Sequence, residues 1–198
     1  VFAIKRPSLP RHFMIVTGEY GLRKQIEKNI PAFYPLRSGY TTGACATAAA
    51  KAALTALILG EEQKMISFRL PDDEEMTLPV SHTEIEKNSA TCTVVKDAGD
   101  DPDVTHGASI VVTVSFSNHP DIRFLQGEGV GRVTLPGLGL EIGEPAINRI
   151  PRQMIMKELS ALYDKGLDIT ISVPGGKELA QRTFNPKLGI VDGISIIG

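Results

Sequence analysis

The stretch that decides the fold is Arg37-Ser38-Gly39-Tyr40-Thr41-Thr42-Gly43-Ala44-Cys45-Ala46-Thr47-Ala48-Ala49-Ala50-Lys51-Ala52-Ala53-Leu54, a polar glycine turn that runs directly into an alanine-rich helix. Thr41 or Thr42 can cap the first turn of this helix with its side-chain oxygen. Eight alanines lie between Gly43 and Leu59, so a sheet or a flat ligand can approach the helix closely. Gly60 is the expected end of the helix.

The start of this helix has two interpretations. Its amides carry partial positive charge that suits a carboxylate or a phosphate, which makes Thr41, Thr42 and Gly43 candidate ligand-binding residues. A tightly packed alanine helix with an ordinary cap explains the same residues equally well. The motif alone does not decide between them.

Composition narrows the class of protein. The chain has 198 residues, 42% of them hydrophobic and 22% charged, as in globular proteins. Its net charge of -2 argues against a general nucleic-acid binder. No apolar run approaches the roughly 20 residues of a membrane helix, so the default compartment is the cytoplasm. The only cysteines, Cys45 and Cys92, form no C-x-x-C pair, so neither a disulfide framework nor a structural metal site is expected.

The order of predicted elements indicates an α+β fold. A second helix should start at Pro151 and close at Lys165 and Gly166. We expect a mixed, mostly antiparallel sheet with two main helices packed on one face. Residues 1–36 read as a linker or the tail of a preceding domain, and residues 37–198 as one domain. Strands are predicted at 65–70, 76–80, 91–96, 109–116, 122–125, 132–134, 168–173 and 194–197.

A polar loop follows the predicted strand at 91–96. It holds four aspartates and a histidine between Lys96 and Gly107. Asp97 or Asp100 is a candidate general base or acceptor for a polar ligand group, with His106 as an additional donor. A calcium loop is a weak alternative because Pro102 interrupts the pattern and the twelfth position lacks a glutamate. A solvated turn with aspartates capping backbone amides explains the loop slightly better than either.

Two glycine-rich turns are candidates for close approach to a cofactor. Glu128, Gly129 and Gly131 precede a strand where a dinucleotide fingerprint would require a helix. The turn Pro174-Gly175-Gly176 lies between a strand and a helix, the order that a nucleotide-like cofactor prefers, but it lacks a phosphate-binding Gly-Lys-Ser/Thr. A glycine-enabled sheet corner explains the first turn equally well.

Five motifs in order resemble one family, the cobalt-precorrin-5B C1-methyltransferases of anaerobic cobalamin biosynthesis. The resemblance runs from about residue 37 to residue 198, and five motifs in order are far more specific than any one. They are Gly39-Tyr40-Thr41-Thr42-Gly43-Ala44-Cys45-Ala46, the loop from Lys96 to Gly107, Gly129-Val130-Gly131-Arg132-Val133-Thr134, Gly143-Glu144-Pro145-Ala146-Ile147-Asn148 and Val173-Pro174-Gly175-Gly176.

The resemblance implies methyl transfer from S-adenosylmethionine to ring carbon C1 of a cobalt-bearing tetrapyrrole. The substrate is rimmed with carboxylates, which the amides of Thr42 and Gly43 and the side chains of arginines can hold. Asp97 or Asp100 would take the proton that the ring loses, or balance the sulfonium charge. The glycine turns at 128–131 and 174–176 would approach the cofactor. The candidate arginines are Arg37, Arg132, Arg149 and Arg152.

The resemblance also sets expectations about domains. Family members continue beyond the apolar end of this sequence, so we expect the first domain of the methyltransferase without the second, folded but inactive alone. Residues 1–7 resemble the closing strand of precorrin-6A reductase, which suggests part of a fused protein. Two alternatives stay open: a phosphate-handling small-molecule kinase, since a glycine turn before a helix also suits a phosphate, and a non-catalytic tetrapyrrole-holding fragment.

Overall fold

The computed structural model describes residues 37–198. The tail expected at residues 1–36 lies outside the described residues. The described elements, in chain order, are α3 (Thr42–Leu59), β1 (Met65–Arg69), β2 (Glu75–Pro79), β3 (His82–Ile85), β4 (Ser89–Val95), β5 (Ser109–Phe116), β6 (Ile122–Gln126), β7 (Arg132–Val133), α4 (Arg149–Ser160), β8 (Leu167–Ser172), α5 (Gly176–Ala180), the 3-10 helix η1 (Asn185–Leu188) and β9 (Ile190–Val191).

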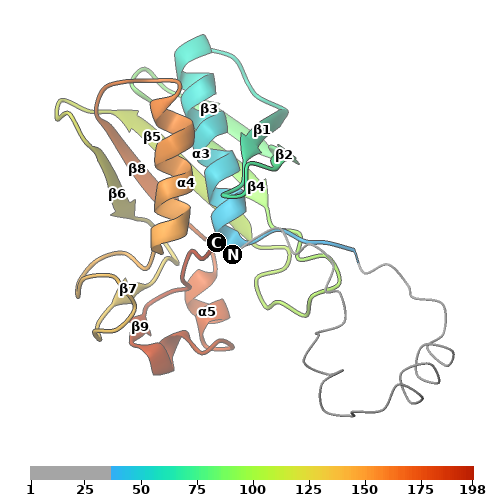
Figure 1. Ribbon diagram of the computed structural model, residues 1–198, viewed down its shortest axis with the longest axis vertical. Coiled ribbons are helices and arrows are strands. Elements are labelled where there is room, and N and C mark those ends of the chain that lie inside the picture. Colours follow the sequence, from blue (N-terminus) through green and yellow to red (C-terminus); the bar gives the residue numbers. More distant parts are fainter. Residues whose placement is uncertain (1–36) are drawn as a thin grey trace, which may run out of the picture.

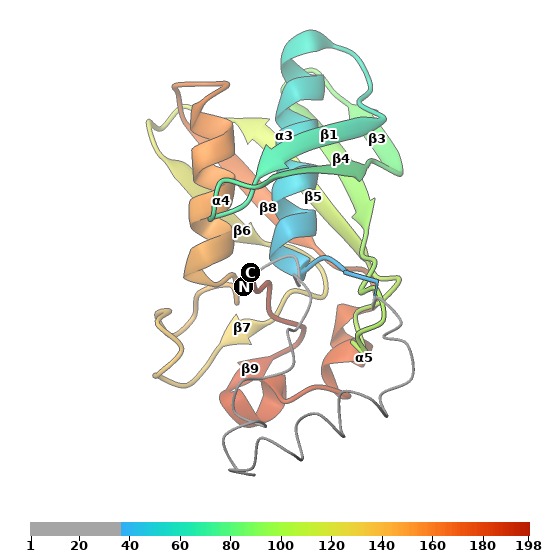
Figure 2. The same ribbon diagram turned by 45° about the vertical axis from the view of Figure 1, so that its right-hand side comes forward.

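The main sheet has five strands in the order β3-β4-β5-β8-β6. All neighbours run antiparallel except β6 and β8, which are parallel. Helices α3 and α4 lie side by side on one face of this sheet, and the β1–β2 hairpin crosses α3 on the side away from the sheet (Figures 1 and 2). The expected α+β fold, mostly antiparallel with two main helices on one face, is confirmed.

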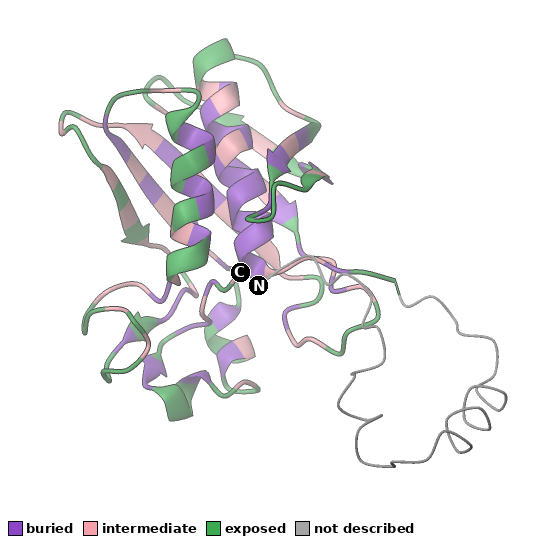
Figure 3. Ribbon diagram, in the orientation of Figure 1, coloured by how far each residue is buried: buried purple, intermediate pink, exposed green. Residues whose placement is uncertain are grey.

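Helix α3 is the centre of the core because its small side chains let other elements cover it. It contacts β4 and β5 of the sheet, α4 and β1, and most of its residues are buried (Figure 3). Thr41 caps the start by accepting a hydrogen bond from the Ala44 amide, and Gly60 ends the helix in the left-handed conformation at φ 72°. By length and composition α3 could cross a membrane, but 72% of it is buried inside the protein, as in the core helix of a globular fold.

Several details differ from the sequence prediction, among them the start of α4 at Arg149 in place of Pro151 and the unpredicted strand β9. The predicted strand at 194–197 is reduced to isolated bridges, Val130 with Ile194 and Ile147 with Ile196, because this segment bonds to two different partners in turn. Strand β3 was missed because an exposed edge strand with polar residues lacks a buried alternating face. Helix α4 ends at Ser160, before the predicted Lys165.

The lower end of the molecule gathers segments that are distant in sequence. The small β7–β9 sheet, α5 and η1 lie below the main sheet and beside the start of α3 (Figure 1). Glycine makes part of this packing possible: a Cβ on Gly39 would overlap the backbone of Ala98. This end therefore brings the predicted polar loop and the start of α3 together.

Candidate functional site

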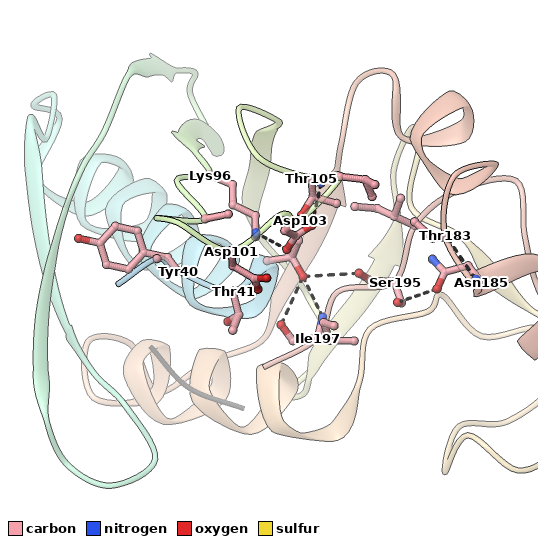
Figure 4. Close-up of a pocket in the computed structure, with 15 residues that line it drawn as sticks. Tyr40, Thr41, Lys96, Asp101, Asp103, Thr105, Thr183, Asn185, Ser195 and Ile197 are labelled. Atoms are coloured by element: carbon pink, nitrogen blue, oxygen red, sulfur yellow. Dashed lines mark hydrogen bonds and ion pairs between the residues drawn. The ribbon is translucent and has the colours of Figure 1, made fainter. Parts of the chain in front are cut away.

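A cavity of about 310 Å³ lies at the start of α3, between the loop that follows β4 and the segment that ends the chain. Figure 4 shows its polar side chains facing one another from these separate segments. Such a volume is at the lower limit of ligand pockets, roughly 300 to 1,000 Å³. The lining residues are Gly39, Tyr40, Thr41, Thr42, Lys96, Ala98, Asp101, Asp103, Val104, Thr105, Thr183, Asn185, Ile194, Ser195 and Ile197.

One wall forms where the turn before α3 docks on the aspartate loop. The Tyr40 amide donates to the Asp97 carbonyl oxygen at 2.7 Å, and the Asp100 amide donates to the Arg37 carbonyl oxygen at 3.0 Å. Gly99, at φ 64°, would place a Cβ into the Arg37 carbonyl, so this contact requires glycine. Two of the five motifs thus build one wall together.

The predicted catalytic residues Asp97, Asp100 and His106 hold this junction and do not line the cavity. The Arg37 guanidinium donates to both oxygens of Asp97, and this contact holds the pKa of the Asp97 carboxyl below its usual value. Asp100 accepts a hydrogen bond from the Arg37 amide at 2.6 Å. His106 Nδ1 accepts one from the Ala98 amide at 3.0 Å. These contacts favour the capping interpretation of the loop, and a catalytic role stays a prediction.

The cavity instead uses two neighbouring aspartates that the sequence analysis did not single out. Asp103 pairs with Lys96 at 2.6 Å, and the Lys96 side chain is only 2% exposed. Burial opposes ionisation of Asp103, but hydrogen bonds from Lys96 and Thr105 outweigh it, so the pKa of this carboxyl lies below its usual value. The carboxylate of Asp101 is exposed and has no side-chain partner among the described residues.

Lys96 could have been found from the strand pattern. Ala90, Cys92 and Val94 are the buried positions of β4, and Lys96 continues their alternation just beyond the strand. A lysine at a core-facing position must find a carboxylate or lose its charge. Because burying a lysine is costly, its presence at this position predicts a nearby carboxylate partner.

The helix start is less open than expected. The Gly43 amide donates to the Ile197 carbonyl oxygen at 2.7 Å, and the Ala44 amide is capped by Thr41 Oγ1 at 3.0 Å. Thr42 Oγ1 accepts from the Ile197 amide at 3.0 Å. The expectation of free first-turn amides is therefore wrong for Gly43, because the end of the chain satisfies its donor. Thr41 and Thr42 remain at the cavity wall.

The predicted substrate arginines do not line the cavity, and most have protein partners. Arg37 is held by Asp97, as described above. Arg132 donates to the Gly143 carbonyl oxygen at 2.8 Å and to Gln126. Arg152 donates to the Ile147 carbonyl oxygen at 2.8 Å and pairs with Glu144 at 3.3 Å. Arg149 is exposed at the start of α4, with no hydrogen bond or ion pair to the part of the chain that the structure describes.

The two predicted cofactor turns meet each other. A Cβ on Gly129 would overlap the Val173 carbonyl, and a Cβ on Gly176 would overlap the Gly129 carbonyl. A Cβ on Gly131 would overlap the Ile190 side chain and the Gly193 carbonyl. A hollow of about 270 Å³ beside this junction is lined by Glu128, Gly129, Gly175 and Gly176, and by Lys177, Glu178 and Asp192. Pro174 does not line it. The glycines serve backbone packing, and a cofactor role for this turn stays a prediction.

Neither cysteine is placed for nucleophilic chemistry. Both thiols are buried and unpaired. Burial raises the pKa of Cys45 to about 12, so this thiol stays protonated at neutral pH. Cys45 is therefore not a candidate nucleophile.

Comparisons with known proteins agree with the five motifs. The sequence model of the CbiD family matches residues 31–198. The chain is 54% identical over 168 residues to the cobalt-precorrin-5B C(1)-methyltransferase of Geobacillus kaustophilus, with 82% of this chain and 45% of the relative covered. It is 50% identical over 167 residues to the protein of that name from Leptospira borgpetersenii, again over 82% of this chain and 45% of the relative.

A solved structure shares the fold. The crystal structure of the cobalamin biosynthesis protein cbiD from Archaeoglobus fulgidus superposes with a TM-score of 0.62 at 30% identity, covering 91% of this chain and 60% of that chain. The chain spans about half the length of the curated relatives it matches. The match over residues 31–198 includes every motif discussed above, and the chain belongs to the CbiD family.

Proposed function

We propose that this chain is part of a cobalt-precorrin-5B C1-methyltransferase that uses S-adenosylmethionine in cobalamin biosynthesis. The observation that carries the proposal is the meeting of two family motifs, the turn before α3 and the loop after β4, around one cavity. The relatives named above carry this activity in their names. The cobalt belongs to the tetrapyrrole substrate.

In this reaction the main task of the protein is to position the methyl donor and the ring carbon. When bound, the donor supplies a sulfonium methyl, whose bond to sulfur breaks as the electron pair of the ring carbon forms the new carbon–carbon bond. The gain of a methyl cation equivalent is balanced by loss of a proton from the ring. Holding both reactants in line contributes much of the rate, so a rigid cavity wall matters more than any single acid or base.

The residues of this chain suit that task. The junction between Gly39 and Ala98 fixes the loop against α3, and the Lys96–Asp103 pair anchors it from inside. Thr41, Thr42 and Thr105 contribute hydroxyl groups to the wall. Asp101 is the carboxylate best placed to take a proton or to oppose a positive charge, in place of Asp97 and Asp100.

The phosphate-handling alternative is less well supported. A nucleotide phosphate would need free amides at the start of α3, but the Gly43 and Ala44 amides donate to Ile197 and Thr41. The carboxylate of Asp101 would also repel a phosphate. A tetrapyrrole-holding fragment without catalysis stays possible only if methyl transfer fails while tetrapyrrole binding persists.

The test is transfer of radiolabelled methyl from S-adenosylmethionine to cobalt-precorrin-5B, followed by mass spectrometry of the product. We would assay the chain alone and the chain joined to the part of the Geobacillus kaustophilus relative that it does not match. Label at C1 in the joined protein supports the proposal. Binding of the tetrapyrrole without any transfer in either form would leave the holding fragment as the better description.

A further inference from the structure

The charges around the cavity do not cancel. Among residues 37–198, three charged side chains line it: Lys96, Asp101 and Asp103. Lys96 and Asp103 neutralise each other at 2.6 Å. The carboxylate of Asp101 has no partner among residues 37–198, and it points toward the side of the cavity lined by Thr41 (Figure 4). The described residues that line the cavity therefore carry a net negative charge, which favours a cation.

A second feature is the largely buried side chain of Asn185 at the cavity wall. Asn185 is 8% exposed, and its Oδ1 accepts a hydrogen bond from Ser195 Oγ at 3.3 Å. Within the described part of the chain its Nδ2 donates to no protein acceptor, although it lies at the cavity wall. A carboxamide held in this way can donate to a ring nitrogen or a carboxylate of a ligand. Asn185 Nδ2 is not a fully buried atom, so it is an accessible donor at the cavity wall and is available to a polar ligand.

The tetrapyrrole and the methyl donor differ in charge and in their hydrogen-bonding groups. The tetrapyrrole is large and rimmed with carboxylates, which Asp101 would repel and a cavity of about 310 Å³ would not enclose. The methyl donor is smaller, carries a sulfonium cation, and has a purine base and ribose hydroxyls that match hydroxyl and amide groups. The cavity thus fits the donor better than the acceptor.

We propose that this cavity binds the sulfonium nucleoside, with Asp101 facing the positive sulfur and Asn185 donating to its polar groups. The inference rests on the proposed function and assigns the two ligands to different places, since the tetrapyrrole would then lie outside the cavity. The inference also predicts easier release of the product. After transfer the sulfur is neutral, so Asp101 no longer attracts it. S-adenosylhomocysteine should therefore bind more weakly than S-adenosylmethionine.

The experiment is isothermal titration of the 198-residue chain with S-adenosylmethionine and S-adenosylhomocysteine. The variants are Asp101→Asn, which removes the charge, and Asp101→Glu, which keeps it. Asp164→Asn is the matched control, because Asp164 is an exposed carboxylate beyond the far end of α4, without an ion pair to a described residue. The Asp101 side chain is exposed and bonds to no described residue, so none of these changes should disturb folding, which circular dichroism would verify.

We expect the native chain to bind the sulfonium form about tenfold more tightly than the neutral product, the scale of one partly screened charge pair. Asp101→Asn should lower affinity for S-adenosylmethionine by about tenfold and for S-adenosylhomocysteine by less than about twofold. Asp101→Glu and Asp164→Asn should retain the preference of the native chain.

Three results would overturn the inference: no binding of S-adenosylmethionine, an equal effect of Asp101→Asn on both ligands, or displacement of the donor by uroporphyrin, a polycarboxylate tetrapyrrole. The methyl-transfer assay separates this outcome from failure of the function. If transfer proceeds while binding ignores Asp101, the function stands and this assignment of the cavity is wrong. If no methyl is transferred and no donor binds, both are wrong.

Discussion

Two glycine junctions lie at the same end of this molecule, and they differ in what surrounds them. At the first, Gly39 and Gly99 let the turn before α3 press against the aspartate loop, beside a cavity with a buried ion pair. At the second, Gly129 and Gly176 pack backbone on backbone beside a hollow whose ion pair, Lys177 with Asp192, is exposed. Glycine permits close approach in both, but only the first lies beside a cavity with a buried charged side chain, Lys96.

The largest expected effect separates the two ion pairs. Asp103→Asn leaves the ammonium of Lys96, only 2% exposed, without its carboxylate, and we expect a loss of roughly 3 kcal/mol of unfolding free energy. Asp192→Asn breaks a pair whose side chains are about two-thirds exposed and should have no measurable effect. Urea denaturation of both variants measures the contrast. Equal losses would show that burial of Lys96 does not govern the first junction.

Alanine substitution tests the close approach at each junction. Gly39→Ala and Gly176→Ala each place a Cβ against backbone atoms, so each should cost roughly 2 kcal/mol of stability. Only Gly39→Ala moves a cavity wall, so only this variant should also weaken ligand binding. Gly107→Ala is the control, since nothing lies within 4 Å of its Cβ and only its left-handed backbone, at φ 77°, is strained, by about 1 kcal/mol. A Gly39→Ala loss no greater than the control would contradict the close packing.

Acid should weaken the first junction through Asp97 and Asp103. In the folded protein, Arg37 lowers the pKa of Asp97. Burial raises the pKa of Asp103, but hydrogen bonds from Lys96 and Thr105 outweigh it, so this pKa is lowered too. Their contribution to stability is therefore complete above the unfolded pKa of about 3.9 and is lost as the pH falls through the lower folded pKa. Thermal unfolding between pH 6 and pH 2 measures this loss. In Asp103→Asn the decline below pH 4 should be shallower, and an unchanged slope would argue against this role of Asp103.

The sequence was enough to predict the scaffold but not the cavity wall. The cap at Thr41, the stop at Gly60 and the strand at 109–116 follow from local rules, and all three are present. Local sequence rules do not predict which aspartates of the loop after β4 face the cavity. Asp100 bonds to the Arg37 amide, while its neighbour Asp101 lines the cavity. Adjacent identical residues differ here only through a contact 63 positions away in the sequence.

The open amide expected at Gly43 was wrong for a similar reason. Thr41, Thr42 and Gly43 read as a site with open amides because Ile197, the partner of Thr42 and Gly43, lies 155 residues from Thr42. No periodicity in either segment indicates that pairing. The burial of Lys96, by contrast, could be predicted from the alternation of buried residues in β4. It was the sequence signal for the cavity that we missed.

The smallest effect concerns the one candidate arginine with no partner among the described residues. Arg149 stands in the first turn of α4, where a positive charge opposes the helix dipole, so Arg149→Gln should leave stability unchanged or raise it by about 0.3 kcal/mol. If Arg149 holds a carboxylate of the tetrapyrrole outside the cavity, the same variant should weaken uroporphyrin binding severalfold and leave S-adenosylmethionine binding unchanged. Asp101→Asn should show the opposite pattern. Fluorescence titration with uroporphyrin and calorimetry with the donor measure the two affinities, and a single variant that weakens both would argue for one shared site.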